Sequence, residues 1–425
     1  MVVAGEHLDG TISGGMLIRG QSGRGSMLKV MTIVGTRPEL IRLSRVIVRL
    51  DDTIDHVLVH TGQNYDFELN EIFFRDLAIR KPDHLLGVDS SSLGHVLGET
   101  LIRTEEVLLA EQPDAVLVLG DTNSCIAALM AKRMRIPVYH MEAGNRCFDE
   151  NVPEETNRRM VDHVADFNLV YTEHARRNLL AEGLHPRRIL LTGSPMREVL
   201  DAYRPQIESS TVLDDLRLDE RGYFLVSAHR EENVDSPERL QKLLDCLVAV
   251  RAEWGLPLYV TTHPRTRRRL EVLPGWTAPE GIVFHKPFGF HDYNRLQLGA
   301  ACVLSDSGTI AEESTILGFP AITLRDSIER PEALETAGIV MTGLDARDVV
   351  YAVRAAMQRH RTGAGPDAAL VPADYQVTNT SERAVGFIMS TARRHGAWAG
   401  IRASAERTGA GAPSAGNTRG PNGDG

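Results

Sequence analysis

The chain is poor in cysteine, has no long apolar run and carries no excess of positive charge. Its four cysteines, Cys125, Cys147, Cys246 and Cys302, lie far apart and lack the spacing of metal ligands, so we expect free thiols in a reducing cytoplasm. No apolar stretch approaches the roughly 20 residues of a membrane-spanning helix, and we expect no membrane association. The net charge of −10 argues against a general nucleic-acid binder, so a bound anion must meet a local basic cluster.

Two further signatures are missing. A G-x-G-x-x-G dinucleotide fingerprint does not follow any predicted strand, which argues against a nicotinamide cofactor. His, Cys, Asp and Glu residues form no cluster with the spacing of metal ligands. We therefore expect neither a cofactor nor a metal.

What the chain does have is a regular alternation of strand-like and helix-like segments. A hydrophobic content of 42% and a charged content of 24% are ordinary for a globular protein. Alternation of this kind predicts parallel, doubly wound α/β sheets with helices on both faces. Apolar runs predict strands over 28–34, 56–60, 115–119, 137–141, 167–171 and 189–192, and a second series over 223–228, 258–261, 282–285, 302–305 and 321–324.

The two series are separated by a polar stretch near 203–222, so we expect two Rossmann-like domains that face a cleft. Met27 precedes the first strand and is a possible alternative start. The predicted parts are a flexible Gly/Ser-rich extension over 1–26, a first domain over 27–203, a second domain over 204–377, a helix over 378–398 that could pack back on the first domain, and a disordered tail over 403–425.

A charged loop follows the strand at 137–141. Between His140 and Arg158 it holds the carboxylates of Glu142, Asp149, Glu150, Glu154 and Glu155, with the guanidinium of Arg146 among them. Open α/β sheets bind ligands at the carboxyl ends of their strands, where this loop begins. It therefore combines candidate proton-transfer groups with candidate anion-binding groups.

Two other turns of the first half join a strand to a helix. Gly35-Thr-Arg37-Pro38-Glu39 suits an anion, because free N–H groups and the helix dipole would point at it, although a plain turn with a surface Arg37 is the alternative. Asp121, after Gly120, is either a general acid/base or the cap of the next helix.

The second half carries two comparable motifs. His229 and Arg230 end its first predicted strand and could reach a phosphate, or His229 could be structural. Ser305-Asp-Ser307-Gly308-Thr309-Ile-Ala-Glu-Glu313 opens a helix whose N-terminus could hold a diphosphate, with Glu313 accepting from a ribose diol. A capping serine with a surface glutamate is the alternative there.

Together these motifs resemble the non-hydrolysing UDP-N-acetylglucosamine 2-epimerase family. The resemblance covers about 31–394 and implies a two-domain fold like that of GT-B glycosyltransferases, UDP held mainly by the second domain, and a homodimer. It rests on Gly35-Thr-Arg-Pro-Glu39, Gly120-Asp-Thr122, Met141-Glu-Ala-Gly144, Pro153-Glu-Glu155, Asn157-Arg158, His229-Arg230, Asp306-Ser-Gly308 and Glu329-Arg-Pro331.

The resemblance also implies roles for individual residues. Asp121, Glu142 and Glu154 match the catalytic carboxylates, with His229 beside them, and we expect Arg146 and Arg158 to hold Glu142 and Glu154 in place. Arg42 stands where many members have lysine, which keeps the charge but changes its geometry. Residues matching contacts to the diphosphate, uracil, ribose or sugar are Arg37, Arg42, Tyr293, Ser307, Gly308, Thr309, Glu313 and Arg330.

The implied reaction is inversion at C2 of a UDP-N-acetylhexosamine through elimination and re-addition of UDP. The segments His60–Asp66, Asp121–Cys125, His140–Asp149 and Gly193–Met196 resemble the branch that makes UDP-N-acetyl-L-fucosamine from UDP-2-acetamido-2,6-dideoxy-L-talose. Conversion of UDP-GlcNAc to UDP-ManNAc is the other possibility. The residues after Gln63, Asn64-Tyr65-Asp66, differ from the His and Arg of the UDP-GlcNAc enzymes, so we expect no activation by a second substrate molecule. A hydrolysing epimerase and a GT-B glycosyltransferase are alternatives.

Overall fold

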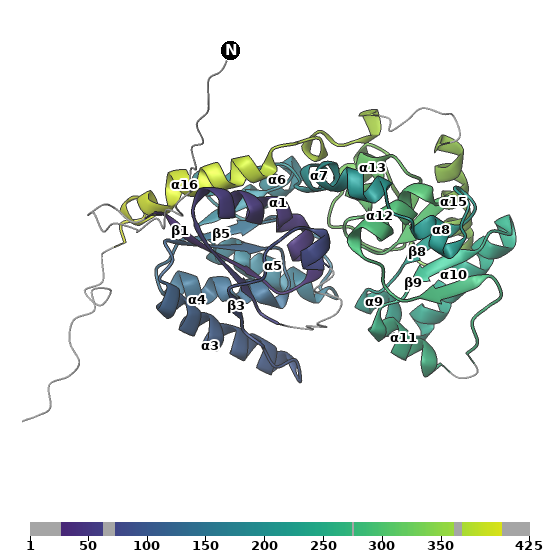
Figure 1. Ribbon diagram of the computed structural model, residues 1–425, viewed down its shortest axis with the longest axis horizontal. Helices are drawn as coiled ribbons and strands as arrows, with labels where there is room; N and C mark the ends of the chain where they lie inside the picture. Colours follow the sequence, from purple (N-terminus) through teal and green to yellow (C-terminus); the bar gives the residue numbers. More distant parts are fainter. Residues whose placement is uncertain (1–26, 63–72, 274–275, 361–367, 402–425) are drawn as a thin grey trace, which may run out of the picture.

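The computed structural model describes residues 27–62, 73–273, 276–360 and 368–401. The predicted extension over 1–26, the tail over 403–425 and the segment Asn64-Tyr65-Asp66 lie outside the described residues. Two parallel sheets with helices on both faces form the two bodies of Figure 1, which confirms the predicted two-domain Rossmann-like class.

The first sheet has seven strands in the order β3-β2-β1-β4-β5-β6-β7. Its central strands read as continuous apolar runs, such as AVLVL in β4, because helices cover both faces. The strands are β1 (Lys29–Val34), β2 (Asp55–His60), β3 (His84–Leu85), β4 (Ala115–Leu119), β5 (Val138–Met141), β6 (Phe167–Val170) and β7 (Ile189–Leu191).

The second sheet has six strands in the order β10-β9-β8-β11-β12-β13, which repeats the pattern of the first. In both sheets the chain reverses direction along the sheet between the first and fourth strands, and ligands of doubly wound folds bind at that point. The strands are β8 (Phe224–Ser227), β9 (Leu258–Thr261), β10 (Ile282–His285), β11 (Cys302–Ser305), β12 (Ala321–Thr323) and β13 (Val340–Met341).

Helices connect the strands within each domain. Those of the first domain are α1 (Arg37–Thr53), α3 (Leu93–Glu111), α4 (Ala127–Arg133), α5 (Pro153–Val164), α6 (Glu173–Ala181) and α7 (Met196–Glu208), with the 3₁₀ turns η1 (Asn123–Ile126) and η2 (Pro186–Arg188). Those that follow are α8 (Val212–Leu216), α9 (Glu231–Val234), α10 (Pro237–Trp254), α11 (Pro264–Glu271), α12 (Phe290–Gly299), α13 (Ile310–Leu317), α14 (Glu332–Glu335) and α15 (Ala346–His360), then η3 (Ala368–Leu370), η4 (Ala373–Tyr375) and α16 (Thr380–Trp398).

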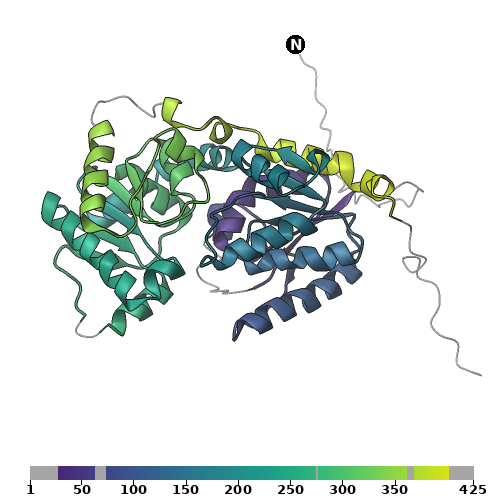
Figure 2. The ribbon, with the colours of Figure 1, turned by 180° about the vertical axis from the view of Figure 1, so that it is seen from behind.

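The last helix, α16, runs from the second domain back over the first, beside α1, in both views (Figures 1 and 2). Its Thr391 shares a hydrogen bond of 2.6 Å with the buried Tyr139 hydroxyl of β5. The ring of Phe387 packs edge-on against Tyr139 and Phe167, at centroid distances of 6.1 and 5.2 Å. The hydrophobic core of the first domain is therefore completed by the end of the chain.

Candidate functional site

Glu142 stands directly after β5 with a left-handed backbone, at a φ of 64°. This conformation is uncommon for a residue with a side chain, and where it occurs the surrounding structure must enforce it, often at a functional site. Leu119 of β4 pairs with Met141 of β5, so Asp121 and Glu142 follow neighbouring strands. The structure thus brings these two predicted carboxylates to the same edge of the sheet.

The Glu142 side chain belongs to a ring of alternating charges. Its Oε2 lies 3.3 Å from Nη1 of Arg42 in α1, and its Oε1 accepts a short hydrogen bond from Nη2 of Arg330 in the second domain. Arg42 also donates through Nη2 to Glu312 of α13 at 3.0 Å. All four side chains are at most one-tenth exposed, so two domains meet through two glutamates and two arginines shielded from water.

Burial raises the pKa of Glu142 above its ordinary value, and the positive charges of Arg42 and Arg330 oppose that rise. A carboxyl with a raised pKa is suited to proton transfer near neutral pH. Two arginines beside it are also suited to a diphosphate, which the guanidinium group binds bidentately.

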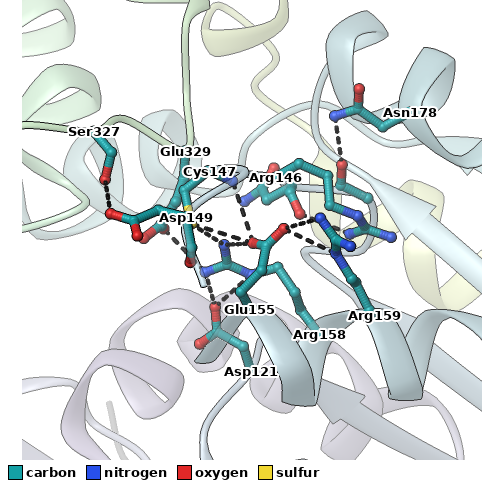
Figure 3. Close-up of polar contacts among 12 residues, drawn as sticks. Asp121, Arg146, Cys147, Asp149, Glu155, Arg158, Arg159, Asn178, Ser327 and Glu329 are labelled. Carbon is teal, nitrogen blue, oxygen red and sulfur yellow. Dashed lines mark hydrogen bonds and ion pairs between the residues drawn. The ribbon is translucent and has the colours of Figure 1, made fainter. Parts of the chain in front are cut away.

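Asp121 is held by Arg158 of α5 (Figure 3). Its Oδ2 accepts from Nε of Arg158 at 3.0 Å and from Nη2 in a shorter bond. Arg158 also donates to Glu155 at 2.8 Å and lies 3.3 Å from Glu329 of the second domain. The guanidinium, with 3% of its side chain exposed, therefore fixes Asp121 by ion pairing and joins the two domains a second time.

Glu154 lies in the first turn of α5, next to Glu155. Burial is the main cause that raises the pKa of Glu154, and the negative charge of Asp121 adds to it. Arg230 of the second domain acts in the opposite direction. Glu154 therefore lies among groups of both domains and is a second, partly buried carboxyl suited to proton transfer.

The prediction that Arg146 and Arg158 hold Glu142 and Glu154 in place is wrong, because both arginines pair with other carboxylates. Arg158 pairs with Asp121, Glu155 and Glu329, and not with the two carboxylates expected. Arg146 donates to Asp162 and to Glu182, each at 2.7 Å. Helix α5 points Glu155, Arg158 and Asp162 into the protein, and this helical spacing decides the pairing.

Glu39 connects the turn after β1 to the turn after β4 by hydrogen bonds. Its carboxyl accepts from the Gly35 N–H at 3.0 Å and, in a shorter bond, from the Ser124 hydroxyl. Burial raises its pKa to about 7. A Cβ at Gly35 would lie only 2.6 Å from Thr61 Oγ1 and 2.9 Å from Ser124 Cβ, so this close approach requires glycine.

Arg37 begins α1, and its guanidinium lies over the ring of Phe73, 5.4 Å from the centroid. Its charge is also among those acting on His263 of the second domain, whose pKa is lowered to about 4, mainly by burial. Arg37 therefore faces the second domain from the first.

On the opposite side, His229 and Arg230 follow β8. Both backbone N–H groups donate to the buried carboxylate of Asp306, at 3.0 Å each to Oδ2. Asn233 donates to the same oxygen at 3.1 Å. The His229 side chain is 47% exposed, so Asp306 fixes the backbone while the imidazole stays accessible.

The segment Ser307-Gly308-Thr309 leads from β11 into α13. The hydroxyls of Ser307 and Thr309 lie 2.9 Å apart, and the Gly308 carbonyl accepts a short bond from Nη1 of Arg330. A Cβ at Gly308 would approach that nitrogen to 2.8 Å and Nη2 of Arg230 to 3.3 Å. Ser307, Gly308 and Arg330 also line a small cavity of about 10 Å³, which is room for a single water.

Tyr293 of α12 and Glu313 of α13 also belong to the second domain, where Tyr293 is partly buried and Glu313 is buried. Glu313 accepts from the amide of Gln297 at 2.6 Å, and burial raises the pKa of both Glu313 and Tyr293. The negative charge of Glu313 also raises the pKa of Tyr293, so the two are near neighbours. This arrangement places neutral and acceptor groups behind the segment at Ser307.

The structure adds site residues that the motifs did not assign. Glu312 completes the charged ring, Ser194 donates to it at 2.5 Å, and Glu329 joins the Arg158 cluster. Glu312 could have drawn attention because it stands beside Glu313 in a helix with four apolar neighbours, where a charged side chain requires a partner.

Across the described ranges, no helix is both long and apolar enough to cross a bilayer. The same residues contain no group of three or more His, Cys, Asp or Glu side chains that could hold a metal ion.

Comparison with known proteins gives a consistent result. The family model described as UDP-N-acetylglucosamine 2-epimerase matches residues 48–389. The UDP-N-acetylglucosamine 2-epimerase of Methanocaldococcus jannaschii is 36% identical over 80% of this chain and 95% of its own length. A solved structure of UDP-N-acetylglucosamine 2-epimerase from Rickettsia bellii is 44% identical, with a TM-score of 0.82 over 88% of this chain and 100% of that one. A structure of the M. jannaschii UDP-GlcNAc 2-epimerase in complex with UDP-GlcNAc and UDP is 34% identical, with a TM-score of 0.79 over 85% of this chain and 100% of that one.

Proposed function

Because the chain belongs to the UDP-N-acetylglucosamine 2-epimerase family, we propose that this epimerase is non-hydrolysing and inverts C2 of a UDP-N-acetylhexosamine. The observation that carries the proposal is Glu142, a buried carboxyl on a left-handed backbone, held between two arginines that come from different domains. This arrangement supports proton transfer and diphosphate binding by side chains that lie within one ion-pair distance of each other.

The chemistry explains why both functions are needed together. The proton at C2 of an N-acetylhexosamine is barely acidic, so its simple removal is implausible. If the C1–O bond breaks as a carboxylate takes that proton, the bonding electrons leave with UDP and a 2-acetamidoglycal forms. Protonation of C2 on the opposite face, with return of UDP to C1, gives the epimer without net consumption of water.

Glu142 and Glu154 are the candidates for the two proton-transfer steps, because burial raises the pKa of each. Asp121 has a different setting, since its carboxylate is bound to Arg158. We propose that Asp121 orients the sugar or the two glutamates from this fixed position, while His229 lies beside the sugar and diphosphate.

For UDP, we propose the segment Ser307-Gly308-Thr309 with Arg37, Arg42 and Arg330. The guanidinium groups supply the positive charge that a departing diphosphate needs. Behind them, Tyr293 and Glu313 are proposed for uracil and ribose. Support for this placement comes from the M. jannaschii structure with UDP-GlcNAc and UDP, whose fold matches 85% of this chain.

The substrate is proposed as UDP-2-acetamido-2,6-dideoxy-L-talose, giving UDP-N-acetyl-L-fucosamine, or else UDP-GlcNAc, giving UDP-ManNAc. The loop His140–Asp149 supports the first choice by its resemblance to that branch. Purified protein assayed with both UDP-sugars side by side decides between them, since only the true substrate will reach an equilibrium of C2 epimers at a useful rate.

Turnover in deuterated water tests the elimination mechanism. We expect deuterium at C2 of the product, because the proton taken from the substrate exchanges before the opposite face is protonated. Product that retains its original C2–H after turnover contradicts the mechanism. Phosphorus NMR of the same mixture separates a hydrolysing enzyme, which would accumulate free UDP instead of a UDP-sugar.

We also propose that the protein works in the cytoplasm as a homodimer. The four cysteines are free and buried, as suits a reducing compartment. Ile102 and Leu109, which lie on one face of α3, are each about 60% exposed and would be covered by a partner of the same kind. Analytical ultracentrifugation should give about twice the chain mass, and Ile102→Glu with Leu109→Glu should shift it toward the monomer.

A further inference from the structure

Glu312 is a buried carboxylate that contacts both domains, yet it has no part in the chemistry described above. It lies in the first turn of α13, with its side chain fully shielded from solvent. Its Oε1 accepts from the Ser194 hydroxyl at 2.5 Å, and its Oε2 accepts from Nη2 of Arg42 at 3.0 Å. Nε of Arg330 lies 3.8 Å from the same Oε2.

Glu312 and Glu142 therefore share the same two arginines. Arg42 reaches Glu142 through Nη1 and Glu312 through Nη2. Arg330 reaches Glu142 through Nη2 and Glu312 through Nε. The ring holds two positive and two negative charges, so it is neutral as a whole, as a buried cluster should be.

We propose that Glu312 is a positioning residue that competes with Glu142 for Arg42 and Arg330 and so leaves Glu142 free enough to take the C2 proton. This inference rests on the proposed function of the same site. Without the charge of Glu312, both arginines would act on Glu142 alone and would hold it in its ionised, hydrogen-bonded form. A carboxylate held in that way is a weaker base.

The position of Glu312 suits a residue that holds the two arginines in place, and not a residue that contacts the substrate. Ser194 occupies its remaining oxygen, and α13 fixes its backbone, so it remains in place when a diphosphate draws the arginines away from Glu142. Each arginine thus keeps one protein carboxylate while it gains the substrate. The guanidinium groups stay directed into the site before and after UDP leaves C1.

Other charged or titratable groups act on the ring and enter any pH dependence. The negative charge of Asp121, in the turn after β4, acts on Glu142, and Glu313 of α13 lies next to Glu312. The groups of the remaining elements that interact with the ring are Tyr171 after β6, Glu329 before α14 and Tyr375 of η4.

The test is Glu312→Gln, which keeps the shape of the side chain and removes its charge. We expect kcat to fall about tenfold or more, the acidic limb of the kcat/KM profile to move to lower pH, and the Kd for UDP to stay the same or decrease, because one positive charge is no longer balanced. An unchanged kcat overturns the proposal. Equal losses of kcat and UDP affinity with an unmoved acidic limb overturn it as well, since they indicate only structural damage.

Two further variants keep the test decisive. Glu312→Asp retains the charge and should recover part of the lost kcat and return the acidic limb toward its original position. Ser194→Ala removes one hydrogen bond to Glu312 and should shift kcat and the limb in the same direction as Glu312→Gln, by a smaller factor. If Glu312→Gln does not fold, an unmoved limb in Ser194→Ala overturns the proposal.

The matched control is Glu208→Gln on α7, where Glu208 forms an exposed pair with Arg204 at 2.7 Å. This control should behave as wild type in all three measurements. Failure of the proposed function is recognised separately, because wild-type protein would then place no deuterium at C2. Normal exchange in wild type with an unaffected Glu312→Gln variant would reject the role of Glu312 alone.

Discussion

The two sheets share one strand order but differ in what their carboxyl ends present. After β4 and β5 the first domain presents carboxylates, one of them on a left-handed backbone and one bound to Arg158. After β8 and β11 the second domain directs one buried carboxylate, Asp306, toward its own backbone N–H groups, and the neutral segment Ser307-Gly308-Thr309 follows it. Under the proposed function, the same framework serves proton transfer in one copy and nucleotide binding in the other, and the two copies differ in their loops.

The largest expected effect is on catalysis by Glu142, and it distinguishes proton transfer from nucleotide binding. Glu142→Gln should lower kcat by about 10³-fold or more, because general acid/base catalysis by a positioned carboxyl contributes on that order. The Kd for UDP should change by less than about threefold, since most of the residues proposed to contact the nucleotide belong to the second domain. Steady-state kinetics and calorimetric titration with UDP measure the two quantities. Near-normal turnover would remove Glu142 from the acid/base role, and a large loss of UDP affinity would show that the halves are not separable.

The next largest effect concerns Arg158, whose guanidinium group pairs with carboxylates of both domains. Arg158→Met should lower the free energy of unfolding by about 3–5 kcal/mol, because the buried Glu155 and Glu329 and the partly buried Asp121 would lose their shared positive charge. Chemical denaturation measures this loss. Arg159→Met is the control, since Arg159 is 42% exposed and pairs with Glu155 from the protein surface. Similar losses in both variants would argue against the buried cluster as the cause.

A third prediction concerns pH and the first domain. The pKa of Glu39 rises from 4.5 to about 7 on folding, so the folded state opposes its ionisation. The resulting cost is absent below pH 4.5, grows as the pH rises, and is complete above pH 7, where it reaches about 3 kcal/mol. Wild type should lose up to that amount between pH 5 and pH 8 relative to Glu39→Gln.

Urea denaturation of wild type and Glu39→Gln at both pH values measures this difference. Glu208→Gln, which changes an exposed glutamate, should follow wild type. Parallel pH profiles for wild type and Glu39→Gln would show that the Glu39 carboxyl ionises as readily in the folded state as in the unfolded one.

The smallest expected effect lies in the second domain. Gly308→Ala places a methyl group 2.8 Å from Nη1 of Arg330, which must then move. We expect UDP to bind about tenfold more weakly, in line with the cost of modest overpacking, while the stability of the first domain stays unchanged. Gly386→Ala in α16, where a Cβ has open space, is the control. Unaltered UDP binding in Gly308→Ala would move the diphosphate away from this segment.

Much of the architecture could be predicted because periodicity is a local property of the sequence. Alternating apolar runs and helical segments gave the confirmed fold class, whereas β3 and β13, with two residues each, are too short to produce any period. Asp121 and Glu142 could be placed at one sheet edge because each follows a strand.

Pairing between distant side chains could not be predicted in the same way. Arg158 meets Glu329 across the two domains, and Glu312 meets Arg42 over 270 positions. The neighbours Glu154 and Glu155 are indistinguishable in the sequence, yet α5 turns Glu155 toward Arg158 and leaves Glu154 near Asp121 and Arg230. Such choices depend on helix rotation and domain placement, which no local pattern records.

The return of α16 has a consequence for the order in which the protein folds. Tyr139 and Phe167 are synthesised before the strands of the second domain, but their partners Phe387 and Thr391 are synthesised after all of them. The first domain therefore keeps an uncovered apolar surface on α1 and β5 while the second domain, whose strands all lie within 224–341, is synthesised and can close. The first domain is then the later of the two to reach its native state, and loss of residues 380–398 should damage that domain first.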